Sequence, residues 1–302
     1  MKPDLDLDAL LVLDAIARRG SFAAAAEELH RAPSSVTYAI KKLEEHLGVM
    51  LFDRRGQRAR LTPAGEALLR EGRDLLKLAD DVARHVKRVA TGWEAELRIA
   101  VGDVVPYGKV LELCGAFYQV APDTRLRLST EVLGGTWDAL VAGRADLVLG
   151  APGDAPSIGG YAMHPLGEVE FVFAVAPHHP LAREPEPLTR DLIRRYRAVA
   201  AADSSRELPP RTVGLLPGQQ VLAVPDLHIK REAQKRGLGV GWLPRHLIAR
   251  DIATGALIVK ATEDGPSVRH AVYCAWCIRH QGKALAWFRE RLCGEHPWLL
   301  IS

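Results

Sequence analysis

The sequence predicts a multidomain chain in which a small helical domain, a long helix and a larger α/β domain follow one another. Its 302 residues are about twice the size of a common domain. The first fifty residues or so carry three short helical patterns, a single long helical pattern follows, and strand and helix patterns alternate from residue 94 onward. These patterns predict the domain ranges 1–61, 62–91 and 92–302.

Composition bounds the class of protein. An apolar content of 48% and a charged content of 25% are ordinary for a globular chain, and a net charge of +3 by itself indicates no partner. No run of about 18 apolar residues is present, so we expect no membrane-spanning helix and no membrane partner. The first residues, MKPDLDLDALL, lack the basic start and apolar core of a signal peptide. We therefore expect a cytoplasmic protein.

Three helices are expected in residues 8–46. Residues 8–18 carry an apolar stripe at helical spacing, formed by Leu10, Leu13 and Ala17, and Gly20 ends this first helix. Ser21 is a good N-cap for the second helix. Pro33 suits the first position of the third, where its missing N–H costs nothing, and Gly48 ends that helix. The connection between the second and third helices is only about four residues long.

The third helix has two opposite faces on a helical wheel. One face carries Val36, Ala39, Ile40, Leu43 and Leu47 and is expected to pack on the other two helices. The other carries Ser34, Tyr38, Lys41 and Glu45, with Thr37 and Lys42 on its flanks. Short polar side chains at the start of a helix that follows a tight turn are typical of a helix-turn-helix that enters the major groove of DNA.

We therefore predict an interface with double-stranded DNA on this helix. Its hydroxyls can bond base edges or phosphates, and its lysines can hold phosphate oxygens. The candidate residues are Ser34, Ser35, Thr37, Tyr38, Lys41 and Lys42. The alternative is an ordinary solvated helix face.

An arginine-rich turn follows in VMLFDRRGQRARL, where two short apolar runs predict a β-hairpin, or wing. Arg54, Arg55 and Arg58, with Arg60 beside them, are expected to follow the DNA backbone or the adjacent minor groove. The alternative is a surface charge run without a ligand.

A long helix is expected to begin at Pro63 after the capping residue Thr62, although Gly65 stands where a capping box has Glu or Gln. Apolar and small residues alternate four and three positions apart, which is typical of a coiled-coil seam. The seam residues are Leu68, Gly72, Leu75, Ala79, Val82, Val86 and Val89. We expect this helix to form a dimer; the alternative is a helix that packs on its own domain.

The rest of the chain predicts an α/β domain. Expected strands are residues 97–101, 125–132, 146–150, 170–176, 197–202, 220–224, 239–243 and 269–277. Expected helices are residues 109–120, 137–142, 189–195, 227–236 and 283–291. Alternation of this kind favours a mostly parallel sheet covered by helices. About 180 residues are generous for one small sheet, so two α/β subdomains with a cleft between them fit better.

The first 90 residues resemble a LysR-type transcriptional regulator. The resemblance rests on SFxxAAxxL (21–29), VTxxIxxLExxLG (36–48), LFDR (51–54) and LTPAG (61–65). It continues more weakly through GRADLV (143–148) and HPL (179–181). The family usually has Ser-Gln-Pro-Ala where this chain has Ala-Pro-Ser-Ser at 32–35, so base reading by that glutamine must pass to neighbouring residues of the same helix.

The resemblance implies a C-terminal effector domain of two subdomains like those of periplasmic binding proteins, with a small-molecule effector between them. It also implies self-association as a dimer and further as a tetramer. The implied regulator binds promoter or operator DNA and is not an enzyme. The other readings are a solute-binding module or an α/β enzyme that carries a helical N-terminal domain by chance; no nucleophile elbow or phosphate-binding loop supports the enzyme.

Three places where a strand is followed by a turn or helix are candidates for effector binding, because backbone N–H groups there can hold an anion. They contribute Asp103, Val104, Leu133, Gly134, Gly135, Ser204 and Ser205. The resemblance places the first two of these loops near the family's effector contacts. Asp103 stands where many family members have Ser or Thr, and an unpaired carboxylate there would repel an anionic effector.

No metal and no cofactor is expected. Cys274 and Cys277 form a CxxC, but positions i and i+3 of a strand face opposite ways, so we expect both to pack. His178 and His179 lack a further ligand at usable spacing. Trp137 is expected in the core, with a pocket wall as the alternative.

Overall fold

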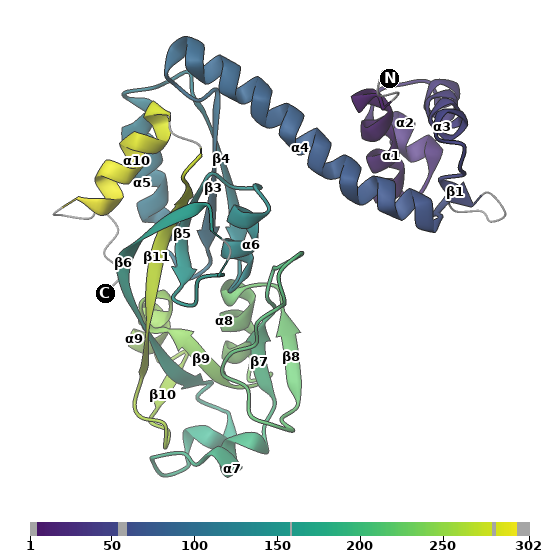
Figure 1. Cartoon of the computed structure of the whole chain (residues 1–302). Helices are drawn as coiled ribbons and strands as arrows, with labels where there is room; N and C mark the ends of the chain where they lie inside the picture. The colour runs from purple at the N-terminus through teal and green to yellow at the C-terminus, as the bar shows by residue number, and fades with distance from the viewer. Residues whose placement is uncertain (1–4, 54–58, 158, 280–281, 295–302) are drawn as a thin grey trace. The chain divides into compact units, whose positions relative to one another are not determined.

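In the computed structural model, the chain divides into two units, Met1–Ala90 and Thr91–Ser302 (Figure 1). The structure describes residues 5–53, 59–157, 159–279 and 282–294. Each unit has hydrophobic clusters of its own, and each is described here by itself.

The N-terminal unit begins with three helices, α1 (Leu7–Arg19), α2 (Phe22–Glu28) and α3 (Pro33–Leu47). Each predicted boundary has its expected cause. Ser21 Oγ accepts a hydrogen bond from Ala24 N at 3.1 Å, and Gly20 and Gly48 end their helices with φ of 72° and 68°. The helices enclose a core that includes Leu13, Ile16 and Ile40.

A short antiparallel hairpin follows, formed by β1 (Phe52–Asp53) and β2 (Arg60–Leu61). Helix α4 (Pro63–Thr91) begins next, and Thr62 Oγ1 accepts from Gly65 N at 3.0 Å. A Cβ on Gly65 would lie 2.2 Å from the Leu51 carbonyl oxygen. The capping box is therefore incomplete because no side chain fits at this position.

The C-terminal unit contains a seven-stranded sheet with the order β10-β6-β11-β5-β3-β4, in which β9 also pairs with β6. A separate parallel pair is formed by β7 and β8. The strands are β3 (Glu96–Gly102), β4 (Arg125–Glu131), β5 (Leu147–Pro152), β6 (Tyr161–Val175), β7 (Ala198–Ala201), β8 (Val221–Val224), β9 (Gly241–Pro244), β10 (Ile258–Lys260) and β11 (Val268–Cys277). The α-helices are α5 (Tyr107–Tyr118), α6 (Gly135–Val141), α7 (Arg190–Arg194), α8 (Leu227–Lys235), α9 (Ala249–Ala253) and α10 (Lys283–Cys293).

The expectation of a mostly parallel sheet is wrong. Only β3 pairs in parallel within the large sheet, with β4 and β5, and helices α5 and α6 follow β3 and β4 as parallel connections require. The long strands β6 and β11 pair with each other over ten positions, and every pair that they make is antiparallel. Strand β10 and helix α9 were also not predicted.

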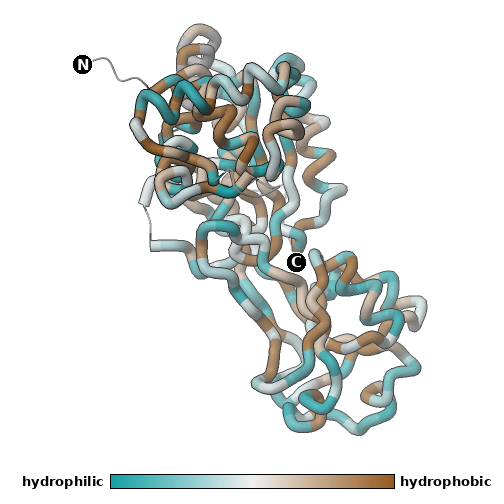
Figure 2. Tube along the Cα trace, turned by 90° about the vertical axis from the view of Figure 1, so that its right-hand side faces the viewer, coloured by the Kyte–Doolittle hydropathy of each residue, from teal (hydrophilic) through white to brown (hydrophobic). Residues whose placement is uncertain are grey.

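The long pair β6–β11 runs through two subdomains (Figure 1). We call residues 91–169 and 272–294 the first subdomain and residues 170–271 the second. In the first, helices α5 and α10 cover one face of the sheet and α6 covers the other. Helices in both units show hydrophobic stretches alternating with hydrophilic ones, as expected for elements that bury one side (Figure 2).

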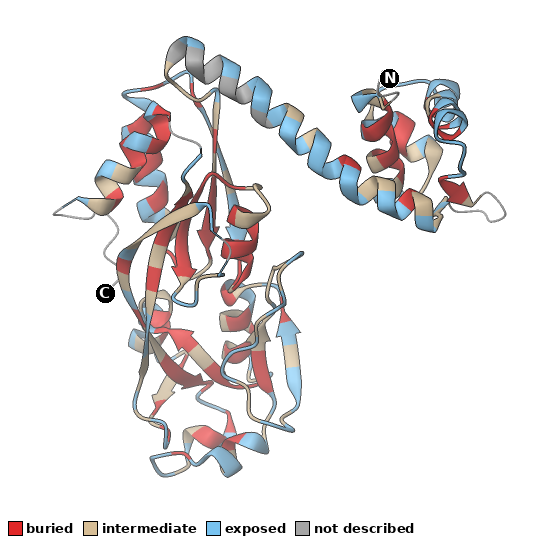
Figure 3. Cartoon of the chain, in the orientation of Figure 1, coloured by how far each residue is buried: buried red, intermediate tan, exposed pale blue. Residues whose placement is uncertain are grey.

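Buried residues concentrate on the central strands of the first subdomain (Figure 3). Trp137 of α6 is completely buried there, and its Nε1 donates to the Pro152 carbonyl at 2.9 Å, so its predicted core role is confirmed. Cys274 and Cys277 lie on opposite faces of the sheet, in the clusters beneath α10 and α6 respectively. Burial raises the pKa of the Cys274 thiol.

Candidate nucleic-acid interface and ligand site

The outer face of α3 carries the six side chains predicted to contact DNA, and all six are exposed. Tyr38 is the largest of them and is 67% exposed. On the opposite face, Val36, Ile40 and Leu43 are buried in the helical core. Leu47 is exposed, so its predicted inward position is wrong; it lies in the last turn, beside the helix-ending Gly48.

The hydroxyls on this face divide into two kinds. Ser35 Oγ donates to the Ala32 carbonyl at 2.8 Å, and Thr37 Oγ1 donates to the Pro33 carbonyl at 3.0 Å. These two oxygens keep acceptor capacity but have used their proton within the helix. Ser34 and Tyr38 have no such bond to the helix, so they are the better candidates for donation to a base or phosphate.

The turn before α3 is fixed by contacts that sequence reasoning missed. Arg31 makes a bidentate ion pair with Asp8 of α1, with its Nη1 and Nη2 at 2.7 and 2.6 Å from the two carboxylate oxygens. The backbone N–H of Arg31 donates to the Ala26 carbonyl at 2.9 Å, and His30 adopts a φ of 52°. The turn therefore holds the start of α3 against both preceding helices.

Glu44 links α3 to the wing. It is 6% exposed, and its Oε1 accepts hydrogen bonds from Leu51 N at 2.8 Å and from Phe52 N at 3.3 Å. Glu44 lies one helical turn after the buried Ile40, and this spacing could have revealed that its side chain is buried. Arg54, Arg55 and Arg58, the predicted wing contacts, lie outside the described residues.

Helix α4 has two regions. Leu68 packs on the core of its own unit, and Gly72 contacts Leu10 of α1. Farther along, an apolar stripe is exposed: Leu75, Leu78, Val82 and Val86 (Figure 3). The alternative of packing on its own domain therefore holds for the first part of the predicted seam. Leu78, which the predicted seam omits, belongs to the exposed stripe.

The predicted effector loops lie where the two subdomains meet. Strands β3 and β4 are parallel, so their carboxyl ends carry Asp103 and Leu133–Gly135 at one edge of the sheet. Strands β7 and β8 are also parallel, and their carboxyl ends carry Ser204 and the start of α8. We call this region, in which the loops after β3 and β4 bond the loops after β7, β8 and β9, the inter-subdomain junction.

Hydrogen bonds close the junction on the β3 side. Asp103 Oδ2 accepts from Leu227 N, the first residue of α8, at 3.0 Å. The Val104 carbonyl lies 2.9 Å from His246 Nε2. Burial raises the pKa of Asp103 to about 6, against the hydrogen bond from Leu227 N–H. The carboxylate that sequence analysis singled out is therefore paired, with a helix N-terminus of the other subdomain.

Hydrogen bonds also join the two subdomains on the β4 side. Ser204 Oγ accepts from Val132 N at 2.9 Å and donates to Glu131 Oε2 at 2.6 Å. Gly134 N donates to Asp203 Oδ2 at 3.0 Å. A Cβ on Gly135 would lie 1.8 Å from Ser204 Oγ, so only glycine allows this approach.

Two other predicted effector residues, Ser205 and Leu133, make no such side-chain hydrogen bond between the subdomains in the described part of the chain. Ser205 Oγ is buried and has no hydrogen-bond partner among the described residues. Leu133 contributes its backbone, with a φ of 49° and a carbonyl that accepts from Thr136 Oγ1 at 3.0 Å.

Sequence reasoning missed several polar residues of this region. Asp203 is one, since it accepts from Gly134 N and Arg211 N. Lys230 and Gln234 of α8 are others, and both are buried. Burial lowers the pKa of the Lys230 ammonium to about 8, against the attraction of Asp103. Asp103 follows β3 and Lys230 lies in α8, far apart in the sequence, so no local pattern joins them.

Beside the junction, a buried ion-pair network stabilises α6. Arg144 bonds Glu131 Oε1 at 2.9 Å and Asp138 Oδ2 at 2.6 Å. Asp138 is completely buried, and its other oxygen accepts from Glu207 N and Leu208 N at 2.8 and 2.7 Å. Arg144, which belongs to the GRADLV segment (143–148), therefore has a structural role in this network.

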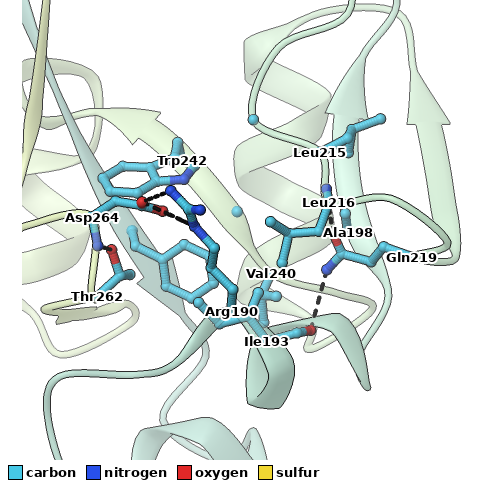
Figure 4. A pocket seen from close by; sticks show the side chains of 13 residues that line it. Arg190, Ile193, Ala198, Leu215, Leu216, Gln219, Val240, Trp242, Thr262 and Asp264 are labelled. Carbon is cyan, nitrogen blue, oxygen red and sulfur yellow. Dashed lines mark hydrogen bonds and ion pairs between the residues drawn. The ribbon is translucent and has the colours of Figure 1, made fainter.

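A pocket of about 300 Å³ lies in the second subdomain, away from the predicted loops (Figure 4). Trp242, Arg190 and Asp264 stand at one side of it, and Leu215 and Leu216 stand at the other. Its polar groups bond one another. Arg190 Nε donates to Asp264 at 3.0 Å, and Gln219 Nε2 donates to the carbonyls of Ile193 and Tyr196. Gln219 Oε1 accepts from Leu216 N at 3.2 Å.

The described residues contain no group of three or more His, Cys, Asp or Glu side chains placed to hold a metal ion. His179 Nδ1 instead accepts from Leu181 N at 3.2 Å at the start of a short 3-10 helix. Within the described ranges, no helix is both long and apolar enough to cross a membrane.

Comparisons with known proteins match both units. Residues 7–66 match the family model of the bacterial regulatory helix-turn-helix protein, lysR family, and residues 90–295 match that of the LysR substrate binding domain. The chain is 42% identical over 292 residues to the uncharacterized HTH-type transcriptional regulator YeeY of Escherichia coli K12, covering 97% of this chain and 94% of that protein. It is 41% identical over 283 residues to the probable HTH-type transcriptional regulator YhaJ of the same strain, covering 94% of each.

Among solved structures, the full-length CbnR in complex with its target DNA matches with a TM-score of 0.61 and 21% identity. The match covers 95% of this chain and 98% of CbnR. At this identity the likeness concerns the fold.

Proposed function

We propose that this chain, which belongs to the LysR family of bacterial transcriptional regulators, binds duplex DNA through the outer face of α3 and a small-molecule effector at the inter-subdomain junction. The observation that carries the DNA-binding part is the contrast between the two faces of α3. Val36, Ile40 and Leu43 anchor one face, while Ser34 and Tyr38 leave the other exposed and polar. A helix anchored in this way holds its exposed polar side chains in a fixed position from which they can contact bases.

The six predicted residues of α3 have distinct roles in this proposal. Ser34 and Tyr38 donate to base edges or phosphates, and Ser35 and Thr37 act as acceptors because their protons are already used. Lys41 and Lys42 contact phosphates. Lys41 lies 3.6 Å from Glu45 across an exposed surface, a weak pair that a phosphate can replace. Arg54, Arg55 and Arg58 are proposed to contact the backbone beside the groove.

Self-association through α4 follows from its exposed stripe of Leu75, Leu78, Val82 and Val86. Apolar residues at this spacing bury their surface when a second copy of the helix packs against them. A dimer would place two α3 helices on a pseudo-palindromic site, with half-sites one helical turn or more apart. A tetramer is proposed from family membership alone.

The junction is the proposed effector site. Its residues are Asp103, Val104, Leu133, Gly134, Gly135, Ser204 and Ser205. Hydrogen bonds of Asp103, Val104, Gly134 and Ser204 join the two subdomains. A ligand that replaces some of these bonds would favour a different arrangement of the subdomains. We propose a regulator without enzymatic activity that acts in the cytoplasm, where its DNA is found.

The experiment that tests the proposal is selection of duplex fragments from random DNA by the purified protein at low ionic strength. The expected result is enrichment of a pseudo-palindrome. A variant with the substitutions Ser34→Ala and Tyr38→Ala should enrich no defined sequence, while Glu45→Gln on the same face serves as the matched control. Equal enrichment by the double variant and the wild type would contradict the role of α3.

A further inference from the structure

Two buried polar residues lie one helical turn apart on α8, Lys230 and Gln234. Lys230 is 8% exposed, and the charge of Asp103 acts on its ammonium. Gln234 is 0% exposed, and neither its Oε1 nor its Nε2 has a partner among the described residues. Buried polar groups are almost always hydrogen-bonded, because losing water without a replacement is costly.

The two side chains lie together beside the junction. A Cβ built on Gly241 of β9 would lie 3.1 Å from Gln234 Nε2 and 3.6 Å from Lys230 Cε. Asp103 attracts the Lys230 ammonium across the boundary between the subdomains. Helix α8 thus brings an ammonium and an amide toward the loop whose carboxylate accepts from Leu227 N.

Single polar atoms of Ser205, Trp287 and Arg289 in the same unit also lack partners among the described residues, whereas other polar side chains there are satisfied. Gln219 has a partner for both its oxygen and its nitrogen, as Figure 4 shows at the edge of the 300 Å³ pocket. Asp138 is completely buried and accepts from two backbone N–H groups and from Arg144. Gln234 differs from all of these because both polar atoms of its side chain lack a partner among the described residues.

We propose that Lys230 and Gln234 receive a hydrogen-bond acceptor of the effector while Asp103 receives a neighbouring donor, and that the effector carries no net charge. This inference rests on the proposed function, which places the effector at the junction. An oxygen of the ligand would complete the Lys230 ammonium, and Gln234 can donate to that oxygen or accept from the ligand. Asp103 keeps acceptor capacity beyond its bond from Leu227 N.

The charge balance selects the class of ligand. Asp103 and Lys230 carry opposite charges that cancel, so a bound anion or cation would leave one charge uncompensated in a buried place. Asp226, whose charge acts on Asp103, further disfavours an anion. A primary or cyclic amide fits because its C=O and N–H lie side by side.

The test is thermal unfolding of the full chain with three probes of nearly equal size: benzamide, benzoate and benzamidine, with net charges of 0, −1 and +1. Benzamide is expected to raise the melting temperature of the wild type, and Lys230→Met is expected to abolish the rise. A rise with benzoate or benzamidine but not with benzamide, or no rise with any probe, would overturn the proposal.

A ligand-free comparison keeps the proposal testable if one variant folds poorly. Gln234→Leu removes unpartnered polar atoms and should melt higher than the wild type by about 2 °C or more, whereas Gln219→Leu removes satisfied ones and should melt lower. A lower melting temperature for Gln234→Leu would show that its amide has partners and would overturn the inference. Both variants should bind duplex DNA as the wild type does; failure of the wild type itself to bind DNA would instead contradict the proposed function.

Discussion

The outer face of α3 and the inter-subdomain junction are both polar, but their side chains are engaged differently. On α3, Ser34 and Tyr38 point to solvent and bond nothing else in the protein's described part. At the junction, Ser204 and Asp203 bond the opposite subdomain. Changes on α3 should therefore alter binding without altering stability, whereas changes at or beside the junction should alter both.

The largest expected effect concerns stability beside the junction. Asp138→Ala removes the acceptor for Arg144 and for two backbone N–H groups in a completely buried place. We expect the free energy of unfolding of the C-terminal unit to fall by about 3–5 kcal/mol, measured by urea denaturation. Asp154→Ala, which breaks the exposed pair with Arg211, is the control and should cost less than about 1 kcal/mol. Equal losses would mean that burial of the network does not matter.

The next effect separates the two regions of α4. Val82→Asp places a charge in the exposed stripe, and we expect monomers in sedimentation and DNA binding weakened roughly tenfold or more, because two linked sites bind more tightly than one. Lys77→Asp, on the side of the helix away from Val82, should leave dimers intact. Dimers that survive Val82→Asp would place self-association elsewhere.

On α3, Tyr38→Ala should cost about 1–3 kcal/mol in binding to the selected DNA site and relax the base preference. Because Tyr38 is exposed, the free energy of unfolding should stay within about 0.5 kcal/mol of the wild type. Competition binding with single-base variants of the site measures both affinity and preference. An unchanged base profile would assign base reading to Ser34 or its neighbours.

The smallest effect is a dependence on pH at Lys230. Its folded-state pKa of about 8 lies below the ordinary value of 10.5, so between these two pH values the unfolded chain binds a proton that the folded chain does not. The wild type should therefore gain stability relative to Lys230→Met as the pH rises from about 8 to 10.5. Denaturation curves of both proteins across this range provide the measurement, and parallel curves would contradict the burial of the charge.

The sequence predicted the elements that are determined by residues close together along the chain. Helical spacing from Val36 to Leu43 gave the buried and exposed faces of α3, and Ser21 and Gly48 marked helix ends. The first half of β6 was missed because Pro165 is unusual inside a strand. The structure accommodates Pro165 at a bulge, where the pairing register of β6 and β11 shifts.

The proposed ligand site was predicted only in part, because local sequence patterns reveal only some of its residues. Asp103 and Ser204 stand at strand ends, and strand ends can be recognised locally. Lys230 lies at helical spacing within α8, and only the fold brings it to Asp103. Its importance depends on burial and on the nearby charge of Asp103, and neither can be read from neighbouring residues.

Photochemical cross-linking tests the central claim most directly. The duplex selected by the protein would carry 5-bromouracil in place of thymine, and the cross-linked peptides would be identified by mass spectrometry. We predict cross-links in the peptide that contains Tyr38, on α3. Cross-links confined to residues 91–294 would contradict the assignment of the DNA-binding face.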